Sequence, residues 1–476
     1  MVTDKVTPKS KDVSGWYNDI VLRSGLADYG PAKGTMVFRP YGFAIWEKVQ
    51  EVFNGVLKTK GVENAYFPMF IPYSLLETEK EHVEGFSPEL AIVTIGGGEE
   101  LKEKLVVRPT SETIMYSMWS KWYQSWRDFP ILMNQWANVV RWEKRTYLFL
   151  RTSEFLWQEG HTAHVEHEEA KEMTLWALEQ YRKLYAEHYA MYGIVGKKSK
   201  KERFAGADET YTIEFLMPDG KALQGATSHD LGQNFAKAFN FTFQSRDKDS
   251  AYPWQTSWGL STRSLGGMIL AHGDDTGLIL PPKLAPVQVV IVPIIFDESE
   301  SEVISYAKKI EEELVAAGLR VKLDTRDYSS GFKHNEWEMK GVPVRIEIGP
   351  KEAEQNKVLL KFRIKEGKEL VDSNELTKQI ENHLKTDQEQ LFEKSKKFVE
   401  GNTSVVEDYE QFKEVMTNKR GFIRAFWCED EECESKIKAE TKATTRCLPL
   451  DAKKEEGKCV YCGKKADYRW YFAQAY

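Results

Sequence analysis

The sequence predicts a multidomain α+β protein, and three observations carry that prediction. A hairpin with a charged face lies in the middle of the first part of the chain. From residue 287 onward, strands alternate with helices, which is typical of an α/β domain. All five cysteines lie after residue 427. Because 476 residues are too many for one hydrophobic core, we expect a first domain over residues 1–285, an α/β domain over 286–404 and a small zinc-binding α+β domain over 405–476.

The composition is that of an ordinary globular protein, with 41% hydrophobic and 29% charged residues. The net charge of −7 gives no global attraction to nucleic acid, although a local basic patch would suffice for such a partner. The polar N-terminus lacks the apolar core of a signal peptide, and no apolar run approaches the length of a membrane span. We therefore expect a cytoplasmic protein whose cysteines are not paired in disulfides.

Residues 139–164 are expected to form two antiparallel strands joined by a long basic connection. Side chains in a strand alternate between two faces. One face then carries Val139, Arg141 and Glu143 from the first strand and Phe155, Trp157, Glu159 and His161 from the return strand, with Lys144, Arg145 and Arg151 on the connection. Burying so many unpaired charges would be costly. The hairpin indicates either a site for a nucleoside triphosphate, held by arginine forks and a stacking plane, or a solvated surface with cross-strand ion pairs.

The segment before this hairpin is expected to hold a helix and an extended stretch. Apolar side chains recur at helical spacing ahead of Gly61, at Trp46, Val49, Phe53 and Val56. The stretch AYFPMFIP that follows contains Pro68 and Pro72. Since proline cannot donate a ladder hydrogen bond, this strand belongs at a sheet edge or at an interface. Helix and strand together fit a dimer face or an ordinary edge.

The stretch LVVRPTSE, residues 105–112, is expected to be a short strand that runs into a turn. In an extended chain, Thr110 and Glu112 would point the same way, and a hydroxyl beside a carboxylate can hold an ammonium group. The stretch is also a good helix start, with Thr110 or Ser111 as the N-cap. Both interpretations can hold for one segment.

A helix is predicted over residues 166–192, with Gly193 as its C-cap. His161, His164 and His167 lie around its start, but their spacing crosses a strand-to-helix boundary. A cluster of hydrogen-bonded histidines is therefore preferred to a zinc site. The run KKSKKER, residues 197–203, is interpreted as a solvated basic surface.

A second hairpin is predicted to turn at residues 218–220, where Pro-Asp-Gly follows an apolar strand. Its return strand carries the polar residues Gln224, Thr227, Ser228 and His229. The later stretch WGLSTRSLGGMILAHG runs from a strand into a helix, with Arg263 at or near the first turn. An arginine beside a helix N-terminus is a phosphate-binding arrangement. The alternative is an arginine that is paired with a neighbouring carboxylate.

Residues 287–404 predict a mainly parallel sheet with helices on its faces, because strands such as VQVVIVPI, RVKLDT and PVRIEIGP alternate with helical segments. No glycine-rich dinucleotide turn follows the first of these strands. Basic residues near the ends of these elements indicate either an RNA-binding edge or a solvated rim: Arg326, Lys333, Arg345, Lys361 and Arg363.

The last part of the chain carries two close cysteine pairs. Cys428 and Cys433 have C-x4-C spacing, and Cys459 and Cys462 have C-x2-C spacing. Two such pairs supply the four thiolates of a structural zinc site. Cys447 is left over and is interpreted as a small buried hydrophobic residue. The aromatic end RWYFAQAY is expected to dock on the body of the protein, although termini usually fray.

Taken together, these stretches resemble the class II aminoacyl-tRNA synthetases, and most closely the prolyl-tRNA synthetases of the archaeal and eukaryotic-like type. The helix and strand through Pro68 look like motif 1 of that class, RWE with Arg151 like motif 2, and GLSTR with its helix like motif 3. The ordered set RPTSE, FLWQEGHTAH, WGLSTR, GVPVRIEIGP and the cysteine tail is similar to the prolyl enzymes across nearly the whole chain.

This resemblance implies an antiparallel catalytic sheet, an α/β anticodon-binding domain and a C-terminal zinc-binding domain. It implies a ligase that uses ATP and Mg²⁺ to convert L-proline to prolyl-adenylate and then transfers the prolyl group to the 3′ end of tRNA(Pro). It also implies a homodimer formed through the motif 1 helix and strand, and structural Zn²⁺ on Cys428, Cys433, Cys459 and Cys462.

The resemblance assigns a role to individual residues as well. Thr110, Glu112 and His229 would bind the proline amine, while Arg141 would clamp the proline carboxylate and the α-phosphate. ATP would be held by Arg141, Glu143, Arg151, Thr152, Gln224, Thr227, Ser261 and Arg263. Arg141 and Arg263 are then the catalytic residues, and the carboxylate of Tyr476 would point toward the active site.

Bacterial-type prolyl enzymes carry an editing domain between motifs 2 and 3, and the interval between Arg151 and Arg263 leaves no room for one. We therefore expect activation of some alanine without editing by the same chain. Other interpretations are a threonyl or glycyl enzyme, a paralogue that binds tRNA without charging it, and an RNA-binding zinc protein. The presence of Arg141, Arg151 and Arg263 favours a working enzyme.

Overall fold

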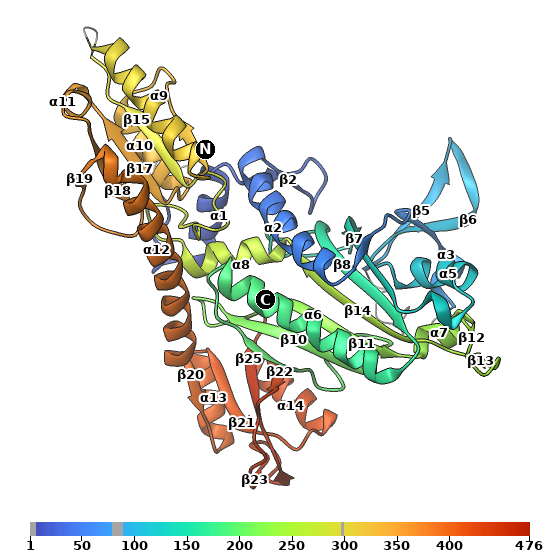
Figure 1. The fold of residues 1–476 in the computed structure, drawn as a ribbon. Helices are drawn as coiled ribbons and strands as arrows, with labels where there is room; N and C mark the ends of the chain where they lie inside the picture. Colours follow the sequence, from blue (N-terminus) through green and yellow to red (C-terminus); the bar gives the residue numbers. More distant parts are fainter. Residues whose placement is uncertain (1–5, 79–88, 297–298) are drawn as a thin grey trace.

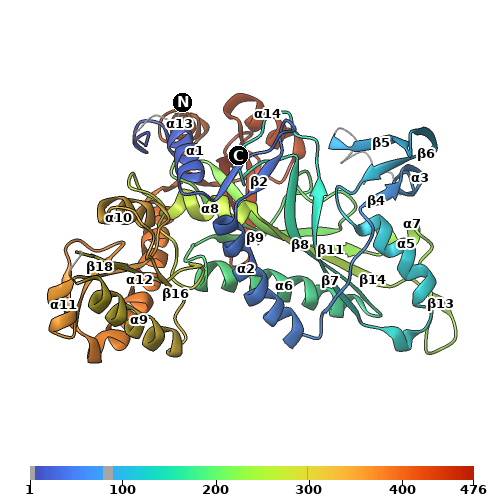
Figure 2. The same ribbon diagram turned by 90° about the horizontal axis from the view of Figure 1, so that it is seen from above.

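A computed structural model of the chain describes residues 6–78, 89–296 and 299–476 (Figure 1). Its largest feature is an eleven-stranded sheet in the order β20-β21-β25-β22-β9-β10-β11-β14-β8-β7-β3. A five-stranded sheet forms a second body, and a small three-stranded sheet projects on the far side (Figure 2). Within the described residues, no helix combines the length and the apolar character needed to cross a bilayer.

The centre of the large sheet is antiparallel, as the resemblance implies. Its strands are β7 (Ile131–Val140), β8 (Glu154–His164), β9 (Ile194–Lys197), β10 (Glu209–Leu216), β11 (Ala222–Gly232) and β14 (Trp254–Ser261). The predicted hairpin is β7 with β8, in which Val139 lies opposite Phe155. The second predicted hairpin is β10 with β11, and it turns between Leu216 and Ala222.

Helix α6 (His167–Glu187) lies across β10, β11 and β14 (Figure 1). It begins with a capping box, in which Glu166 is the N-cap and Glu169 the partner residue. The prediction that Gly193 caps this helix is wrong, because the helix ends at Glu187 and His188 is its C-cap. Burial of the following residues, including Tyr189 and Met191, extends the apolar pattern beyond the helix and explains the error.

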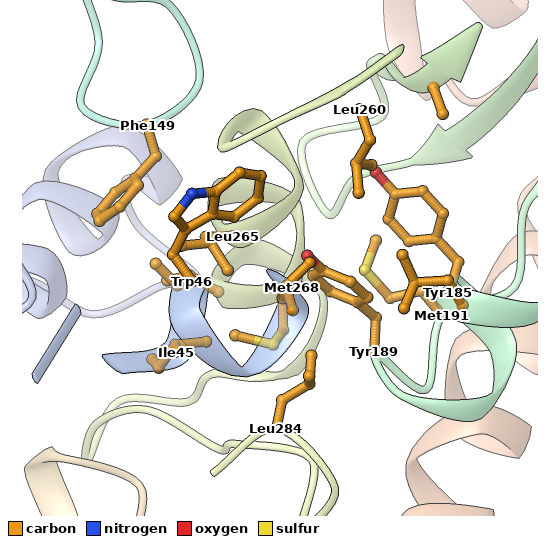
Figure 3. Packing of buried hydrophobic residues seen from close by; sticks show 14 of the residues in the cluster. Ile45, Trp46, Phe149, Tyr185, Tyr189, Met191, Leu260, Leu265, Met268 and Leu284 are labelled. Atoms are coloured by element: carbon orange, nitrogen blue, oxygen red, sulfur yellow. The ribbon is translucent and has the colours of Figure 1, made fainter. Parts of the chain in front are cut away.

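The core beneath the sheet is formed by α2 (Pro40–Thr59), α6, α8 (Arg263–His272) and the segments next to them. Figure 3 shows how their side chains meet. The cluster includes Ile45 and Trp46 from α2, Leu265 and Met268 from α8, and Tyr185, Tyr189 and Met191 from the end of α6 and the chain after it. Burial of these side chains fixes the N-terminus of α8, where Arg263 lies, relative to the sheet.

The remaining elements of the first part surround this core. They are α1 (Val13–Arg23), β1 (Ala27–Tyr29), β2 (Met36–Phe38), β3 (Glu63–Asn64), β4 (Phe70–Pro72), α3 (Tyr73–Leu76), β5 (Ala91–Gly96), β6 (Glu99–Val107), α5 (Glu112–Trp122), the 3-10 turn Trp126–Asp128, α7 (Asn234–Ala238), β12 (Phe243–Gln244) and β13 (Ser250–Ala251). The proline-containing stretch lies at a sheet edge, as predicted, because its strand β4 is an outer strand of the small sheet.

The second body is an α/β domain with sheet order β16-β15-β17-β18-β19. Its elements are β15 (Val289–Pro293), α9 (Glu300–Ala316), β16 (Val321–Leu323), α10 (Ser330–Met339), β17 (Val344–Ile348), α11 (Pro350–Glu354), β18 (Lys357–Phe362), β19 (Glu369–Asp372) and α12 (Ser373–Gly401). The sheet is less parallel than predicted, since β15 pairs in parallel with β16 and β17 but β17–β18 and β18–β19 are antiparallel. The apolar pattern of a buried strand does not depend on its direction.

The basic residues of this domain are largely engaged within the protein. Arg326 pairs with Asp324 and Glu336, Arg345 with Glu347, and Arg363 with Asp274, while Lys333 and Lys361 donate to backbone carbonyls. Neither earlier interpretation, an RNA-binding edge or a solvated rim, holds for Lys333, which is buried, while both stay open for the exposed parts of the other four side chains.

The long helix α12 leads from the α/β domain to the C-terminal part (Figure 1). That part contains β20 (Thr403–Val405), α13 (Tyr409–Asn418), β21 (Phe422–Phe426), α14 (Glu431–Thr441), β22 (Ala443–Pro449), β23 (Gly457–Lys458), β24 (Lys465–Ala466) and β25 (Arg469–Gln474). Its sheet is continuous with the central one, because β22 pairs with β9. A Cβ at Gly196 of β9 would lie 2.4 Å from the carbonyl oxygen of Leu448, so the junction requires glycine there.

Candidate active site

A cavity of about 390 Å³ opens against β8, β11 and β14. It is lined by every active-site residue that the sequence predicted: Thr110, Glu112, Arg141, Glu143, Arg151, Thr152, Gln224, Thr227, His229, Ser261 and Arg263. These residues come from segments that are far apart in the chain. The fold therefore brings the predicted set together, while the ligand of each residue stays a prediction.

Thr110 and Glu112 converge at the start of α5, although the chain there is not extended. Glu112 is the first residue of the helix, and the Thr110 hydroxyl donates to its carboxylate. Ser111 occupies the N-cap position, but its hydroxyl donates to Glu159 Oε1 at 2.5 Å and does not cap the helix. The helix start that the sequence also indicated is confirmed, with Ser111 at the N-cap position, whereas the extended backbone is not found; the two side chains still meet.

Glu159 and His161 extend this end of the cavity into a buried network. Glu159 Oε2 lies 3.0 Å from His161 Nε2, and Gln135 Nε2 donates to Glu159 Oε1 at 2.7 Å. Tyr116 Oη lies 3.2 Å from His161 Nδ1. Burial lowers the pKa of His161, but the hydrogen bond to Glu159 and the charges of Glu112 and Glu159 outweigh it, so the pKa lies above its ordinary value. Two buried carboxylates at one end of the cavity favour a cationic ligand group there.

Arg141 lies in the middle of the cavity. Strand β7 ends at Val140, so Arg141 and Glu143 belong to the connection and not to the strand face that was predicted for them. The Arg141 backbone N–H donates to the Ser153 carbonyl at 2.8 Å, and Arg141 Nε donates to the Pro109 carbonyl at 3.1 Å. Its guanidinium carbon lies 5.6 Å and 5.7 Å from the ring centres of Phe155 and Trp157. Burial lowers the pKa of Arg141 even though nearby glutamates raise it.

The opposite end of the cavity carries two more arginines. Arg263 is the first residue of α8, and its Nε donates to the Leu150 carbonyl at 2.8 Å. Arg151 Nε lies 2.8 Å from Glu143 Oε2. Burial, followed by the charges of Arg141 and Arg151, lowers the pKa of Arg263. Guanidinium groups that repel one another beside a helix N-terminus are suited to a polyphosphate.

His229 closes the amino-acid end together with residues that the sequence prediction missed. Burial lowers the pKa of His229 to about 3, so its ring is neutral at pH 7. Thr210 Oγ1 lies 3.0 Å from His229 Nδ1, and the ring centres of Phe204 and His229 are 4.6 Å apart. Further missed lining residues are Glu89, Glu202, Arg203 and Ser257. The Ser257 hydroxyl is buried without a hydrogen-bond partner, which leaves it available to a ligand.

The interpretation of residues 197–203 as a solvated basic run holds only in part, since Lys200, Lys201 and Arg203 are exposed. Lys198 and Ser199 are buried, and Glu202 and Arg203 line the cavity. The sequence does not reveal this arrangement, because a buried lysine with a carboxylate partner, such as Lys198, cannot be distinguished from a surface lysine by its neighbours in the chain. The available signal was the placement of Glu202 and Phe204 directly after the lysines.

The three histidines around the start of α6 each have a polar partner, as the sequence analysis preferred. His161 contacts Glu159 at 3.0 Å, His164 Nε2 lies 2.8 Å from Thr162 Oγ1, and His167 Nε2 lies 2.8 Å from Asp230 Oδ2. Burial lowers the pKa of His164 to about 4. These separate pairs explain the cluster without a metal ion.

Family models match three consecutive parts of the chain. Residues 93–272 match the model "tRNA synthetase class II core domain (G, H, P, S and T)", residues 288–383 match "Anticodon binding domain", and residues 409–476 match "Prolyl-tRNA synthetase, C-terminal". "Proline--tRNA ligase 2" of Clostridioides difficile is 51% identical over 474 residues, which is 99% of this chain and 98% of that protein. The chain belongs to the prolyl-tRNA synthetase family.

Other relatives extend this match across organisms. "Proline--tRNA ligase" of Chlorobaculum tepidum is 51% identical over 484 residues and covers both chains fully. "Proline--tRNA ligase, chloroplastic/mitochondrial" of Arabidopsis thaliana is 49% identical over 479 residues, which is 99% of this chain and 88% of that protein. The resemblance to prolyl-tRNA synthetases is thereby confirmed.

In this member of the prolyl-tRNA synthetase family, four cysteines gather in the C-terminal part as their spacing predicts. The sulfur atoms of Cys428, Cys433, Cys459 and Cys462 all lie within 4.8 Å of one another, and those of Cys428 and Cys462 are 3.6 Å apart. A tetrahedral zinc ion with bonds of about 2.3 Å holds its sulfurs about 3.8 Å apart. The set therefore fits zinc, while Cys447 lies elsewhere as a fully buried side chain.

The aromatic C-terminus docks on the body of the protein, as predicted. Strand β25 lies between β21 and β22 in the large sheet. The Tyr476 backbone N–H donates to the Ala222 carbonyl at 3.2 Å, and Lys221 Nζ lies 5.0 Å from the centre of the Tyr476 ring. The direction of the terminal carboxylate stays a prediction.

Proposed function

We propose that this chain is a proline–tRNA ligase, which joins L-proline to ATP to form prolyl-adenylate and then transfers the prolyl group to tRNA(Pro). The observation that carries the proposal is a single cavity lined by the buried carboxylates Glu112 and Glu159 and by three arginines. Both glutamates act on the charge of Arg141, which acts in turn on Arg263. Such a polarity matches a substrate pair with an amine on one side and a polyphosphate on the other. The names of the relatives at about 50% identity point to the same reaction.

The carboxylate end would bind proline. Glu112 and Thr110 offer acceptors for the secondary ammonium group, and the neutral His229 offers a polar ring beside them. Arg141 lies between the two ends and would bind the proline carboxylate and the α-phosphate together. Its guanidinium lies within cation–π distance of Phe155 and Trp157 and is tied to the Pro109 carbonyl, and these contacts hold the fork in place for bidentate binding.

The reaction is an in-line attack of the proline carboxylate on the α-phosphorus, with pyrophosphate as the leaving group. It requires alignment and neutralisation of charge more than a general base. Arg141 and Arg263 would neutralise the α- and γ-phosphates, and Arg151, Thr152, Gln224, Thr227 and Ser261 would hold the rest of the nucleotide. The Glu143 carboxylate is a ligand of the type that Mg²⁺ prefers, and the ion would neutralise phosphate charge when bound.

A homodimer through the motif 1 region also forms part of the proposal. Three aromatic side chains of this region are exposed although they are large and apolar: Phe43 of α2 by 37%, Tyr66 by 70% and Phe70 of β4 by 46%. Burial of such side chains against a second copy would be favourable. Elution of the purified chain as a monomer at micromolar concentration would count against this part of the proposal.

Editing by the chain itself is not expected. Between Arg151 and Arg263 the chain forms the strands β8, β9, β10, β11 and β14 of the central sheet, together with α6, α7 and the short hairpin of β12 and β13. A pocket for proline rejects the smaller alanine by only about 1–3 kcal/mol. We therefore expect measurable alanine activation, and alanine-specific deacylation by the purified chain would contradict this expectation.

The test of the function is exchange of labelled pyrophosphate into ATP across the standard amino acids. We expect exchange with proline and its loss in Arg141→Ala. Arg145→Ala is the matched control, because Arg145 lies on the same connection, is exposed and does not line the cavity. Exchange with another amino acid only would overturn the proline assignment. Absence of exchange with every amino acid would favour a tRNA-binding paralogue.

A further inference from the structure

The loop over residues 198–208, between β9 and β10, joins the active-site cavity to the C-terminal part of the chain. We name it the wall loop. Its residues Glu202, Arg203 and Phe204 line the cavity. Its first residues, Lys198 and Ser199, are buried on the side of β22 and α14. The second half of the wall loop thus faces the cavity, while its first residues face the C-terminal part of the chain.

On the C-terminal side, a buried carboxylate holds the wall loop. Glu434 of α14 is only 1% exposed, and it accepts the hydroxyl of Ser199 at 3.1 Å and the hydroxyl of Thr445. Ser199 Oγ in turn accepts the backbone N–H of Glu202 at 3.2 Å. A carboxylate from α14 therefore fixes the turn from which the lining residues project.

Two further contacts join the same helix to the same loop. Lys201 Nζ donates to the Ser435 hydroxyl, and Lys438 Nζ lies 3.8 Å from Glu202 Oε1. Both of these pairs are exposed or half-exposed, so water screens them and each contributes little. The buried Glu434–Ser199 link is the stronger restraint, because loss of a buried partner leaves a polar group without compensation.

On the cavity side, the wall loop holds the proposed proline pocket. The Phe204 N–H donates to Thr210 Oγ1 at 2.9 Å, and that oxygen lies 3.0 Å from His229 Nδ1. The Phe204 ring packs against the His229 ring. The charge of Glu112 acts on His229 more strongly than that of Arg141, so the loop faces the amine end of the cavity.

We infer that Glu434 is a positioning residue for the amino-acid end of the active site, which acts through Ser199 and the wall loop on Phe204 and His229. The inference rests on the proposed function, and it adds that a residue of the C-terminal domain controls affinity for the amino acid. Because α14 also carries Cys433, a ligand of the candidate zinc site, zinc binding and proline binding share one helix.

The test compares Glu434→Ala, which removes the acceptor of the Ser199 and Thr445 hydroxyls, with Ser199→Ala and their double variant in the full-length, zinc-loaded chain. Proline-dependent pyrophosphate exchange gives KM for proline, KM for ATP and kcat. We expect KM for proline to rise about fivefold in each single variant, which corresponds to about 1 kcal/mol. KM for ATP should stay unchanged, and the double variant should resemble either single one because both break the same chain of contacts.

Limited trypsin digestion supplies a readout that does not depend on activity. The wall loop contains Lys200, Lys201 and Arg203, after which trypsin can cleave. Loss of the Glu434–Ser199 contact should make the loop more mobile, so cleavage at these residues should be faster in both single variants. The zinc content per chain should stay unchanged. Glu432→Ala is the matched control, because Glu432 lies on the same helix but is exposed and pairs only with Lys436 among the ion pairs of the described residues. The control should behave as the wild type in both assays.

Three results would overturn the inference. The first is an unchanged KM for proline with unchanged loop cleavage. The second is an equal loss for both substrates together with loss of zinc or of thermal stability, since that pattern indicates a merely structural role. The third is additive effects in the double variant. Absence of proline-dependent exchange in the wild type would instead refute the proposed function, and the cleavage assay would still report on the Glu434 link.

Discussion

The α/β domain and the C-terminal part are both attached to the same catalytic body, but they are attached in different ways. The C-terminal part continues the central sheet through β22 and β9, and a buried ion network crosses the junction. A shared apolar cluster joins it to the catalytic strands and α12: Ile194, Leu216, Ala222, Val399, Phe422, Cys447, Tyr471 and Ala473. The cluster that joins the α/β side is smaller: Ala190, Ile279 and Leu391.

Hydrogen bonds at the rim of the α/β domain help to hold it, and Met339 of α10 also packs against the main core. Arg363 pairs with Asp274 at 2.6 Å, Gln388 Nε2 donates to the Glu187 carbonyl at 3.0 Å, and the Tyr41 hydroxyl donates to the Lys340 carbonyl at 3.2 Å. Such contacts can be remade after a small rotation, whereas a continuous strand ladder cannot. The comparison teaches that the C-terminal part belongs to the catalytic body, while the α/β domain is a separate module.

The largest expected effect comes from Glu214, which is fully buried at the junction of β10, β9 and β22. Lys198 Nζ lies 2.7 Å from its Oε1, and Arg446 Nη2 lies 2.8 Å from its Oε2. Glu214→Ala leaves two buried cations without their carboxylate and should cost about 3–5 kcal/mol of unfolding free energy. Denaturant unfolding of the full chain measures this loss.

Glu209→Ala is the control for that variant, since Glu209 lies on the same strand but is partly exposed and pairs with a partly exposed Lys197. Its cost should be about 1 kcal/mol or less. Equal costs for the two variants would show that the buried junction is no stronger than a surface pair, and the comparison would fail.

The next effect is acid lability of the catalytic body. Burial lowers the pKa of His272 to about 4, and its Nε2 lies 2.8 Å from the Tyr189 carbonyl. Between about pH 6.5 and pH 4 the unfolded chain binds a proton that the folded chain does not. Unfolding free energy should therefore fall as the pH drops through this window, by about 1–3 kcal/mol for His272.

His272→Gln should flatten the dependence of unfolding free energy on pH between about 6.5 and 4. The matched variant is His383→Gln in the α/β domain, where the histidine side chain is 25% exposed and stacks on Phe362. Burial also lowers the pKa of His383, but its partial exposure predicts the smaller change. A larger change in His383→Gln would contradict the assignment of acid lability to the catalytic body.

The smallest effect is expected at the rim of the α/β domain. Asp274 is 44% exposed while Arg363 is only 5% exposed. Asp274→Ala should therefore cost about 1–2 kcal/mol of unfolding free energy, because within the described residues the buried guanidinium keeps only its bond to the Leu278 carbonyl. Proline-dependent exchange should be unchanged, whereas charging of tRNA should fall, because only the second step needs the α/β domain in a fixed orientation. A loss of exchange equal to the loss of charging would show that the domain is not a separate module.

The sequence predicted the active site better than the joints between its parts. Local signals in the sequence predicted three features. The helix that begins at Arg263 shows apolar periodicity, the cysteine pairs have fixed spacing, and the second hairpin has a turn sequence. The pairing of β9 with β22 has no local signal in the sequence. Gly196 and Leu448 are far apart in the chain, and the residues near either one do not specify the other.

The sequence-based predictions failed where residues are buried without belonging to the helix or strand that their apolar pattern suggests, or where their partners are distant in the chain. The apolar pattern continued past Glu187 into buried coil, so the end of α6 was predicted too late. Lys198 was assigned to the surface because its partner Glu214 lies on another strand. Arg141 was assigned to a strand face although β7 ends one residue earlier. The point at which a strand ends depends on its hydrogen bonds to the neighbouring strand, and these cannot be read from Arg141 itself.

The central claim is that the C-terminal part belongs to the catalytic body, and hydrogen–deuterium exchange with and without zinc tests it most directly. After removal of zinc by a chelator, we expect faster amide exchange in α14, in β9 and in the wall loop over residues 198–208. Exchange in β15, β17 and β18 should stay the same. Faster exchange confined to the segments that carry Cys428, Cys433, Cys459 and Cys462, with β9 and the wall loop unchanged, would contradict the account.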